Sequence, residues 1–487
     1  MQHIGFKARD FAVKQLPLQD SRLAILLFIL TLIMRGPFIS TFLYHWDSVQ
    51  FAMGMLQYNV ALHQPHPPGY ILYVALGWIF KQIIGEANLS LTSISLLFSA
   101  LFTVALFYLG RRIYSRKVGL VAAVLALFSP SIWFHGEVAL SYILEAFMVT
   151  IIAWLAYGVT PGDKRRLLCL TLILGLTAGI RQNTGLFLLP LWVWSLWRTA
   201  FTGGRLKSKM IMINVLLLAA VTAVWAIPMI RLSGGLAAYL QSMSFVLHYG
   251  GVVRGISVIE RGFSALQRNL LFQGSYIFFS LHIGIVFLFG GLFLFLISRN
   301  YSRHNFVFYL LWILPSVLFY TLIHVNRPGH IFTYLPALLL LTAIAILRLS
   351  DWLGNKRIIL FTMLMLYCLA GAGLFFLGRQ ETSLPSLRRS EARLERACDY
   401  VMRKTEPAGT LILAKESYRH AQYYLGNYQV VPAFGRWGED FLQKGLKAAG
   451  SQVQHLILFD QDLIDQYSIR HPGAIPKGTT APYVLRR

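Results

Sequence analysis

One aspartate stands out because it directly follows the first long apolar segment. Asp47 belongs to the stretch Tyr44–Tyr73, which also contains three histidines and a Pro-Pro-Gly turn. An ionisable group beside a membrane segment is costly and usually faces a cavity or a partner. A carboxylate there could take the proton from an acceptor hydroxyl as that hydroxyl attacks. The residues Asp47-Ser-Val-Gln50 are also typical of a helix N-cap with its capping-box partner. Both interpretations stay open, and they are compatible.

Two glutamates follow in the segment SPSIWFHGEVALSYILEAF. Glu137 is predicted at an outer turn between two membrane spans, and Glu145 about two turns into the next span. A lone buried glutamate costs a few kcal/mol at the middle of a bilayer, so Glu145 should pair or face a polar cavity. Both are candidate catalytic acids. The alternative is a structural bond to a neighbouring Arg, Ser or Tyr, and it applies more strongly to Glu145.

Basic and polar side chains are predicted at the outer ends of further helices. Arg181 and Asn183 lie in RQNTG, and Arg327 and His330 lie in HVNRPGH. Because arginine binds phosphate in a bidentate manner, these residues could hold a lipid phosphate or its sugar. Phospholipid anchoring or helix capping is the alternative for both arginines. His66, just before the Pro-Pro-Gly turn, could contact a phosphate or make a turn hydrogen bond. The histidines are too dispersed to predict a metal site from spacing.

Membrane helices must position these residues. The 487-residue chain is 56% hydrophobic and only 13% charged, with a mean hydropathy of +0.57, whereas soluble proteins carry about 25% charged residues. Apolar runs of about 17–22 residues recur, each long enough to cross a bilayer. We therefore expect an α-helical polytopic membrane protein. The net charge of +24 does not indicate nucleic acid, because the basic residues cluster in short connectors, as in cytoplasmic loops.

The positions of these basic clusters predict a topology. They are Lys7/Arg9/Lys14/Arg22, Arg111/Arg112/Arg116/Lys117, Lys164/Arg165/Arg166, Arg198/Arg205/Lys207/Lys209, Arg299/Arg303 and Arg348/Lys356/Arg357. About eleven spans place all of them on the cytoplasmic side. The predicted spans are 22–39, 91–109, 118–134, 138–157, 167–180, 184–198, 210–230, 275–297, 306–324, 331–348 and 357–378. The N-terminus is then cytoplasmic in a multi-pass inner-membrane protein.

The first outer loop, 40–90, is predicted to be structured. Its segment 69–84 is apolar, but it is short for a bilayer crossing and contains Lys81, and counting it as a span would reverse every later loop. We therefore expect an interfacial or re-entrant helix there.

The composition becomes that of an ordinary globular domain after about residue 379. One long helix, three short buried strands and a further helix are predicted over 387–404, 410–414, 428–432, 455–460 and 416–425. We expect a transmembrane domain over 1–378 and a small extracytoplasmic α/β domain over 379–487. The latter contains no glycine-rich phosphate loop and so offers no support for an ATP-driven activity.

The ordered set of motifs resembles the GT-C class of membrane glycosyltransferases. An aspartate after the first span is followed by HPPGY, GEVALSYILEAF, GLTAGIRQNTGLFLLPLW and HVNRPGHIFTYLPALL. This order is most similar to the protein O-mannosyltransferase and aminoarabinose-transferase group, over about residues 22–348. The resemblance implies a cytoplasmic N-terminus, a large first outer loop with interfacial helices, an outward-facing catalytic cavity and a polyprenyl-phosphate-linked sugar donor.

The resemblance also implies roles for individual residues. Asp47 would be the first-loop catalytic carboxylate, and Glu137 or Glu145 the second acidic position. The donor phosphate would be held by Arg181, Arg327 and His330. Two positions depart from the pattern. His66 replaces the Lys that aminoarabinose transferases have before Pro, and Asp47-Ser48 replaces the paired Asp-Glu of eukaryotic mannosyltransferases.

We therefore expect a glycosyltransferase that moves a sugar from a polyprenyl-phosphate-linked donor to a hydroxyl of a glycan, lipid or protein acceptor on the outer membrane face. A transporter or lipid flippase is the alternative, and a non-catalytic scaffold is a third reading. The chain has no second copy of the 40–90 loop and few charges within its spans, which favours the enzyme. An outer carboxylate pair could ligate Mg²⁺ or Mn²⁺ or act alone. Membrane lipids are expected partners, and nucleic acid is not.

Overall fold

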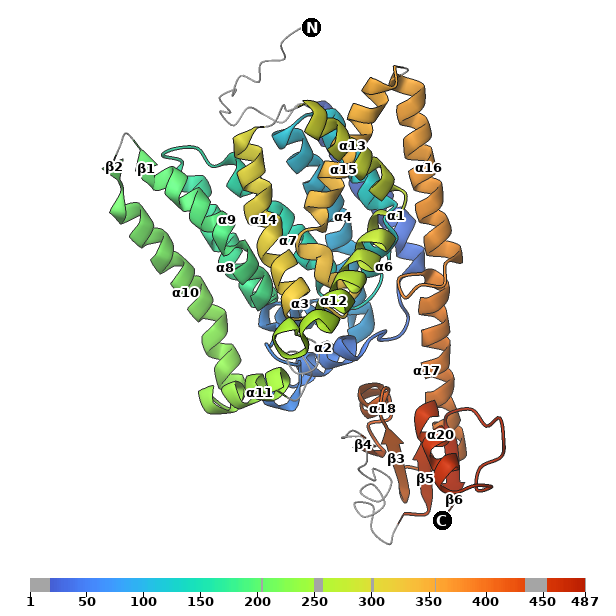
Figure 1. The fold of residues 1–487 in the computed structure, drawn as a ribbon. Helices are drawn as coiled ribbons and strands as arrows, with labels where there is room; N and C mark the ends of the chain where they lie inside the picture. The colour runs from blue at the N-terminus through green and yellow to red at the C-terminus, as the bar shows by residue number, and fades with distance from the viewer. Residues whose placement is uncertain are drawn as a thin grey trace.

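A bundle of long helices carries a small C-terminal domain at one end (Figure 1). This computed structural model describes residues 18–202, 205–248, 257–298, 302–354, 356–433 and 453–486. The predicted fold class is confirmed, because several long apolar helices are combined with a small C-terminal sheet. The basic residues Lys7, Arg9, Lys14, Arg205, Arg299 and Lys356 belong to the predicted cytoplasmic clusters. The side chains of these six residues lie outside the described part of the chain.

Two helices build the first long loop. It follows α1 (Leu18–Arg35) and η1 (Gly36–Phe38), and contains α2 (Trp46–Leu56), η2 (Val60–Leu62) and α3 (Ile71–Ile84). The N-cap of α2 is His45, whose Nδ1 accepts a hydrogen bond from the Asp47 N–H at 3.0 Å. The prediction that Asp47 and Gln50 form the capping box is therefore wrong, since Ser48 is the partner of His45. The Asp47 carboxylate is left for other contacts. At 14 residues, α3 is shorter than a bilayer crossing needs.

The remaining helices of the bundle follow in chain order. They are α4 (Ala87–Ile113), α5 (Arg116–Leu127), α6 (Pro130–His135), α7 (Tyr142–Gly158), α8 (Lys164–Ile180), α9 (Gln182–Ala200), α10 (Ser208–Leu232), α11 (Leu236–His248), α12 (Val258–Leu281), α13 (Gly284–Ser298), α14 (Arg303–Leu322), η3 (Pro328–Thr333), α15 (Leu335–Trp352) and α16 (Lys356–Leu377). A short hairpin, β1 (Phe201–Thr202) and β2 (Arg205–Leu206), joins α9 to α10.

Fewer helices than predicted are long uninterrupted spans. Among the described residues, six helices are long and apolar enough to cross a membrane, or seven if one bent pair counts as a span. The predicted count of eleven is therefore not confirmed. One reason is that the predicted span 118–134 is divided into α5 and α6, because Pro130 starts a new helix. Pro lacks the N–H that would continue the preceding helix.

The predicted span 275–297 is wrong as a single helix. α12 and α13 meet there at an angle of 101°. His282, between them, has the left-handed φ of 38°. Its ring packs against Tyr367 of α16, with ring centroids 4.0 Å apart. The contact with α16 therefore accompanies a break that the continuous apolar sequence does not reveal.

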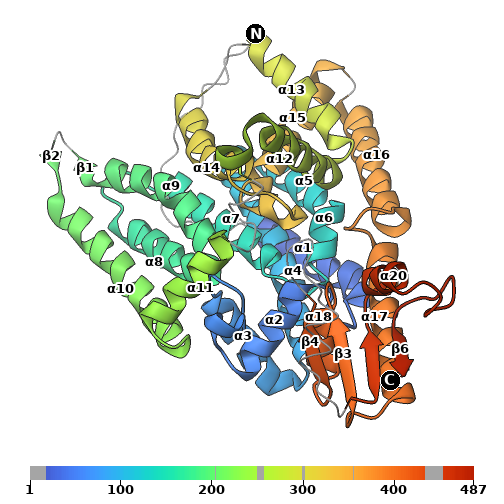
Figure 2. The ribbon, with the colours of Figure 1, turned by 60° about the horizontal axis from the view of Figure 1, so that its bottom comes forward.

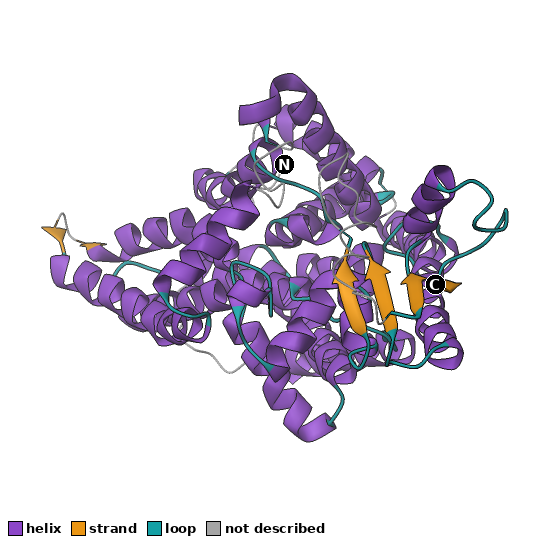
Figure 3. Cartoon of the chain, turned by 90° about the horizontal axis from the view of Figure 1, so that it is seen from below, coloured by secondary structure: helices purple, strands orange, loops and turns teal. Residues whose placement is uncertain are grey.

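The C-terminal domain follows α16 through the long helix α17 (Leu384–Lys404). It contains β3 (Thr410–Ala414), α18 (Tyr418–Tyr424), β4 (Gln429–Pro432), β5 (His455–Leu458), α20 (Gln461–Arg470) and β6 (Tyr483–Arg486). The strand order is β4-β3-β5-β6, with β3 parallel to β4 and β5 and with β6 antiparallel to β5. The three predicted strands correspond to β3, β4 and β5. Figure 2 shows α17 and α18 beside this sheet, and Figure 3 shows the sheet from below.

Two glycines allow α4 and α5 to approach each other closely. A Cβ atom on Gly110 would lie 2.7 Å from the Cα of Gly119, and a Cβ on Gly119 would overlap the carbonyl oxygen of Phe107. Small residues at such crossings let membrane helices pack backbone to backbone. The α4–α5 contact therefore depends on the absence of side chains at both positions.

We predict that Gly119→Ala lowers the thermal unfolding temperature of the detergent-purified protein. The added methyl group meets backbone atoms that cannot move away, and overpacking of this kind costs about 1–3 kcal/mol. Gly373→Ala in α16 is the matched control, because a Cβ there meets no atom within 4 Å. Equal melting temperatures for the two variants would contradict the proposed packing.

Candidate functional site

A small cavity brings three charged residues together at the end of the bundle that carries the C-terminal domain. Asp47 enters it from the start of α2, Arg327 from the turn before η3, and Glu381 from the connection between α16 and α17. Aromatic side chains, among them Tyr44 and Tyr142, form much of the remaining wall. Two carboxylates and one guanidinium from distant parts of the chain thus face one space.

Asp47 lies between two imidazole rings. Its carboxylate oxygens are 3.6 Å from Nδ1 of His45 and 3.8 Å from Nδ1 of His66. Burial raises the pKa of Asp47, but the positive charges of its surroundings, led by His66, His45 and Arg327, outweigh burial and hold that pKa below its usual value. Burial lowers the pKa of His45 to about 4. Asp47 is therefore ionised at neutral pH, the form that can accept a proton.

Arg327 has an intramolecular counter-ion at the mouth of the cavity. Its Nη1 lies 3.6 Å from Oε1 of Glu381, and both side chains are partly exposed. Glu381 was not identified from the sequence. The sequence signal that could have identified Glu381 is the same as for Asp47. Both are acidic residues that come shortly after an apolar segment. Its place in the same cavity depends on how the first and last helices pack.

Glu145 and Arg181 form a buried ion pair. Arg181 Nε lies 2.9 Å from Glu145 Oε2, and the side chains are 9% and 1% exposed. The hydroxyl groups of Thr184 and Thr333 donate hydrogen bonds to the other carboxylate oxygen. The Arg181 guanidinium also lies over the ring of Tyr142 at 4.4 Å. Glu145 therefore has the arginine partner expected if its role is structural. Neither Glu145 nor Arg181 lines the Asp47 cavity.

Glu137 lies elsewhere in the interior. It is fully buried, and its carboxyl oxygens accept no hydrogen bond from the described residues. The buried Arg35 of α1 packs its aliphatic part against Gly136, and its charge acts on that of Glu137. The Glu137 backbone oxygen accepts a hydrogen bond from the N–H of Ser40 at 2.8 Å. Glu137 is not part of the cavity wall.

The other predicted binding residues are divided between two places. His66 contacts Asp47, and its ring also packs against Tyr70 at 4.8 Å. His330 lies buried in η3, with its ring stacked on Tyr320. Asn183 is half-buried in the first turn of α9. Of the predicted site residues, Asp47 and Arg327 line the cavity, and His66 contacts Asp47 from outside its wall. Asn183 and His330 do not line the cavity.

The C-terminal domain holds the segment that leads to Asp47. The N–H of Leu43 donates to the Tyr424 hydroxyl at 3.0 Å, and the Leu43 carbonyl hydrogen-bonds Nε2 of His420 at 2.9 Å. The Phe42 ring stacks on Tyr424 with centroids 3.9 Å apart. Four residues before Asp47, the backbone is thus fixed on both sides by α18.

The described residues offer little to a metal ion. They contain no group of three or more His, Cys, Asp or Glu side chains that could hold one. His45 Nδ1 already accepts the Asp47 amide, and Mg²⁺ takes oxygen ligands in a near-octahedral arrangement. Asp47 and Glu381 are the two carboxylates of the cavity that such an ion would contact. Whether a carboxylate pair here ligates Mg²⁺ or Mn²⁺ or acts alone, the two possibilities left open by the sequence, therefore stays a prediction.

The fold combines a helical bundle, two helices in the first long loop and a C-terminal domain at the same end as that loop. Comparisons with known proteins relate it to membrane glycosyltransferases. A family model described as Protein O-mannosyl-transferase TMEM260 N-terminal domain matches residues 55–203. The Protein O-mannosyl-transferase tmem260 of Dictyostelium discoideum is 33% identical over 107 residues. That match spans 20% of this chain and 13% of the relative.

Two solved proteins share the fold over most of the chain. ArnT from Cupriavidus metallidurans, in the apo state, gives a TM-score of 0.59 at 12% identity and covers 93% of this chain and 95% of its own. Its form bound to undecaprenyl phosphate gives a TM-score of 0.55 at 12% identity and covers 97% of this chain and 98% of its own.

The Archaeoglobus fulgidus oligosaccharyltransferase gives a TM-score of 0.55 in the apo form at 12% identity, over 91% of this chain and 70% of its own. In complex with an inhibitory peptide and a dolichol-phosphate, it gives a TM-score of 0.51 at 12% identity and covers 90% of this chain and 69% of its own. At this identity, the structures establish the fold. Together with the family model, they confirm the resemblance to the GT-C class.

We predict that Glu145→Gln destabilises the protein strongly. The Arg181 guanidinium would remain buried without its counter-charge, and breaking a buried pair in this way costs about 3–5 kcal/mol. Thermal or denaturant unfolding in detergent measures this loss. The double variant Glu145→Leu/Arg181→Met should recover most of it, because both charges are then removed. An unchanged stability in Glu145→Gln would show that the pair does not hold these helices together.

Proposed function

We propose that this protein is a glycosyltransferase that moves a sugar from a polyprenyl-phosphate-linked donor to an acceptor hydroxyl. The observation that carries the proposal is the cavity shared by Asp47 and Arg327, a candidate base beside a candidate phosphate ligand. Two structural neighbours support a lipid-linked donor. ArnT was solved with undecaprenyl phosphate, and the oligosaccharyltransferase with a dolichol-phosphate.

A single displacement with inversion is the simplest reaction for this geometry. Asp47 takes the proton of the acceptor hydroxyl while that oxygen forms a bond to the anomeric carbon. The bond between the anomeric carbon and the phosphate oxygen breaks at the same time, and the polyprenyl phosphate leaves with both bonding electrons. Arg327 stabilises the charge on the departing phosphate. The proton ends on the Asp47 carboxyl group, beside His45 and His66.

The proposed reaction takes place on the extracytoplasmic face of the inner membrane, with the N-terminus in the cytoplasm. The basic clusters support this orientation, because Lys and Arg are retained in cytoplasmic loops. Figure 1 supports it too. The C-terminal domain lies at the same end as α2, and the basic connection between α15 and α16 lies at the other. The acceptor hydroxyl would belong to a glycan, a lipid or a protein.

We predict that Asp47→Asn lowers the rate of sugar transfer by at least about 100-fold, because a positioned general base contributes about 10²–10⁴-fold. The melting temperature should change little, since the carboxylate caps no helix. Product formation from a polyprenyl-phosphate sugar by reconstituted protein measures the rate. Asp399→Asn on the exposed face of α17 is the matched control. Near-normal turnover in Asp47→Asn would contradict the assignment of Asp47 as the general base.

We predict that Glu381→Gln tightens binding of the polyprenyl-phosphate donor by about two- to fivefold, the range expected for one partly exposed ion pair. The Glu381 carboxylate competes with the donor phosphate for Arg327, and the amide does not. Equilibrium binding of undecaprenyl phosphate to the purified protein measures this, with Glu395→Gln on α17 as the control.

The same competition predicts a pH dependence. Burial raises the pKa of Glu381, and Arg327 only partly opposes this. As the pH falls through that pKa, Glu381 loses its charge and releases Arg327, so donor binding by the wild type should strengthen. Glu381→Gln should lose this dependence. Weaker binding in the variant at all pH values would show that Glu381 assists the donor instead of competing with it.

A further inference from the structure

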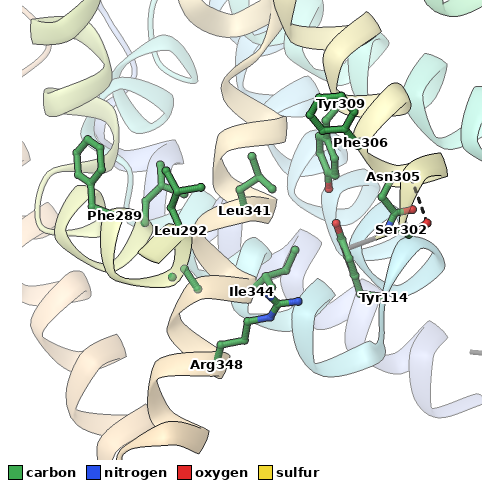
Figure 4. Close-up of a pocket in the computed structure, with 13 residues that line it drawn as sticks. Tyr114, Phe289, Leu292, Ser302, Asn305, Phe306, Tyr309, Leu341, Ile344 and Arg348 are labelled. Carbon is green, nitrogen blue, oxygen red and sulfur yellow. Dashed lines mark hydrogen bonds between the residues drawn. The ribbon is translucent and has the colours of Figure 1, made fainter. Parts of the chain in front are cut away.

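A second, larger cavity lies in the half of the bundle away from the C-terminal domain, between α13, α14 and α15 (Figure 4). Its volume is about 440 Å³. Most of its wall is apolar, including Phe289 and Leu292 of α13 and Leu341 and Ile344 of α15. Phe289 and Leu292 are largely exposed on the outside of the helix bundle. In a membrane, the cavity therefore opens toward lipid chains.

Polar groups collect at one part of this cavity. Figure 4 shows the Arg348 side chain extending from α15 into the space, with Ser302 and Asn305 of the α14 N-terminus on the facing wall. The hydroxyl groups of Tyr114 and Tyr309 point toward each other beside them. Asn305 Oδ1 accepts a hydrogen bond from the Tyr157 hydroxyl at 3.0 Å, and the Asn305 side chain also hydrogen-bonds Tyr114.

This combination selects a chemical class of ligand. The apolar wall suits acyl chains, whereas the guanidinium with its neighbouring hydroxyl and amide donors suits a phosphate diester. Arg348 also belongs to a basic cluster of the type found at cytoplasmic helix ends, and basic pockets between helices on that side bind anionic headgroups. Arg303, which follows Ser302 at the start of α14, is exposed and adds a second positive charge to this end of the helix.

We propose that this cavity binds one anionic diacyl phospholipid of the cytoplasmic leaflet. Its phosphate contacts Arg348, Ser302 and Asn305, and its chains lie against Leu341 and Phe289. The lipid bridges α13, the helix that follows the 101° bend, to α14 and α15. The site lies far along the bundle from the Asp47 cavity and does not depend on the proposed glycosyl transfer.

The test uses the delipidated full-length protein in detergent, titrated with phosphatidylglycerol or with phosphatidylcholine of the same chains. Native mass spectrometry measures bound lipid. We expect phosphatidylglycerol to bind about tenfold more tightly, the effect of one charge-assisted contact. Arg348→Ala should remove that preference. Arg165→Ala, which removes an equally exposed arginine at the start of α8 outside the cavity, should retain it.

Further outcomes decide between the proposal and its rivals. Leu341→Trp narrows the apolar part and should weaken both lipids. Equal binding of the two lipids by the wild type would overturn the proposal. Equal losses of phosphatidylglycerol preference in Arg348→Ala and Arg165→Ala would also overturn it, because the preference would then come from general surface charge. Displacement of phosphatidylglycerol from this site by undecaprenyl phosphate would also overturn it, because the ligand would then be the polyprenyl chain. Arg348 is exposed, so its variant is expected to fold and to keep the test decisive.

Discussion

The buried ion pair between Glu145 and Arg181 is the contact on which the walls of the Asp47 cavity depend. Removing two charges from water is costly, and the cost is offset only when the charges are close and their remaining hydrogen bonds are made. Here Thr184 and Thr333 make them. The pair thus fixes α7, the start of α9 and η3 relative to one another. Tyr142 and the residues just before η3, which line the cavity, belong to these same elements.

In this arrangement, the charged residues that are proposed to act on substrate differ from those that hold the helices together. Glu145 is buried against its arginine and two threonines and does not line the cavity. Within the described part of the chain, Asp47 has two imidazoles at 3.6 and 3.8 Å, distances that leave its oxygens able to accept a proton. Among the same residues, the ion pair of Arg327 is a loose, partly exposed one with Glu381. Groups that are proposed to act on substrate are therefore the ones that the protein leaves least engaged.

Sequence analysis could find single residues and local elements, but not their partners. Asp47 was recognisable because a carboxylate beside an apolar segment is rare, and β3 because TLILA is a typical buried strand. Three results depended on contacts between distant segments. The bend at His282 accompanies its packing on Tyr367, the pairing of Glu145 with Arg181 joins two helices, and Glu381 reaches the cavity because α16 packs near the first loop. No periodicity in a single sequence reports such contacts.

The connection between α16 and α17 brings the C-terminal domain into contact with the Asp47 cavity. Glu381 lies within this joint, while α18 of the same domain grips the backbone of Leu43, four residues before Asp47. The domain therefore contacts the cavity at two places, at the counter-ion of Arg327 and at the segment that leads to Asp47. The shape of a cavity inside the helix bundle is thus set in part by residues that lie outside the bundle.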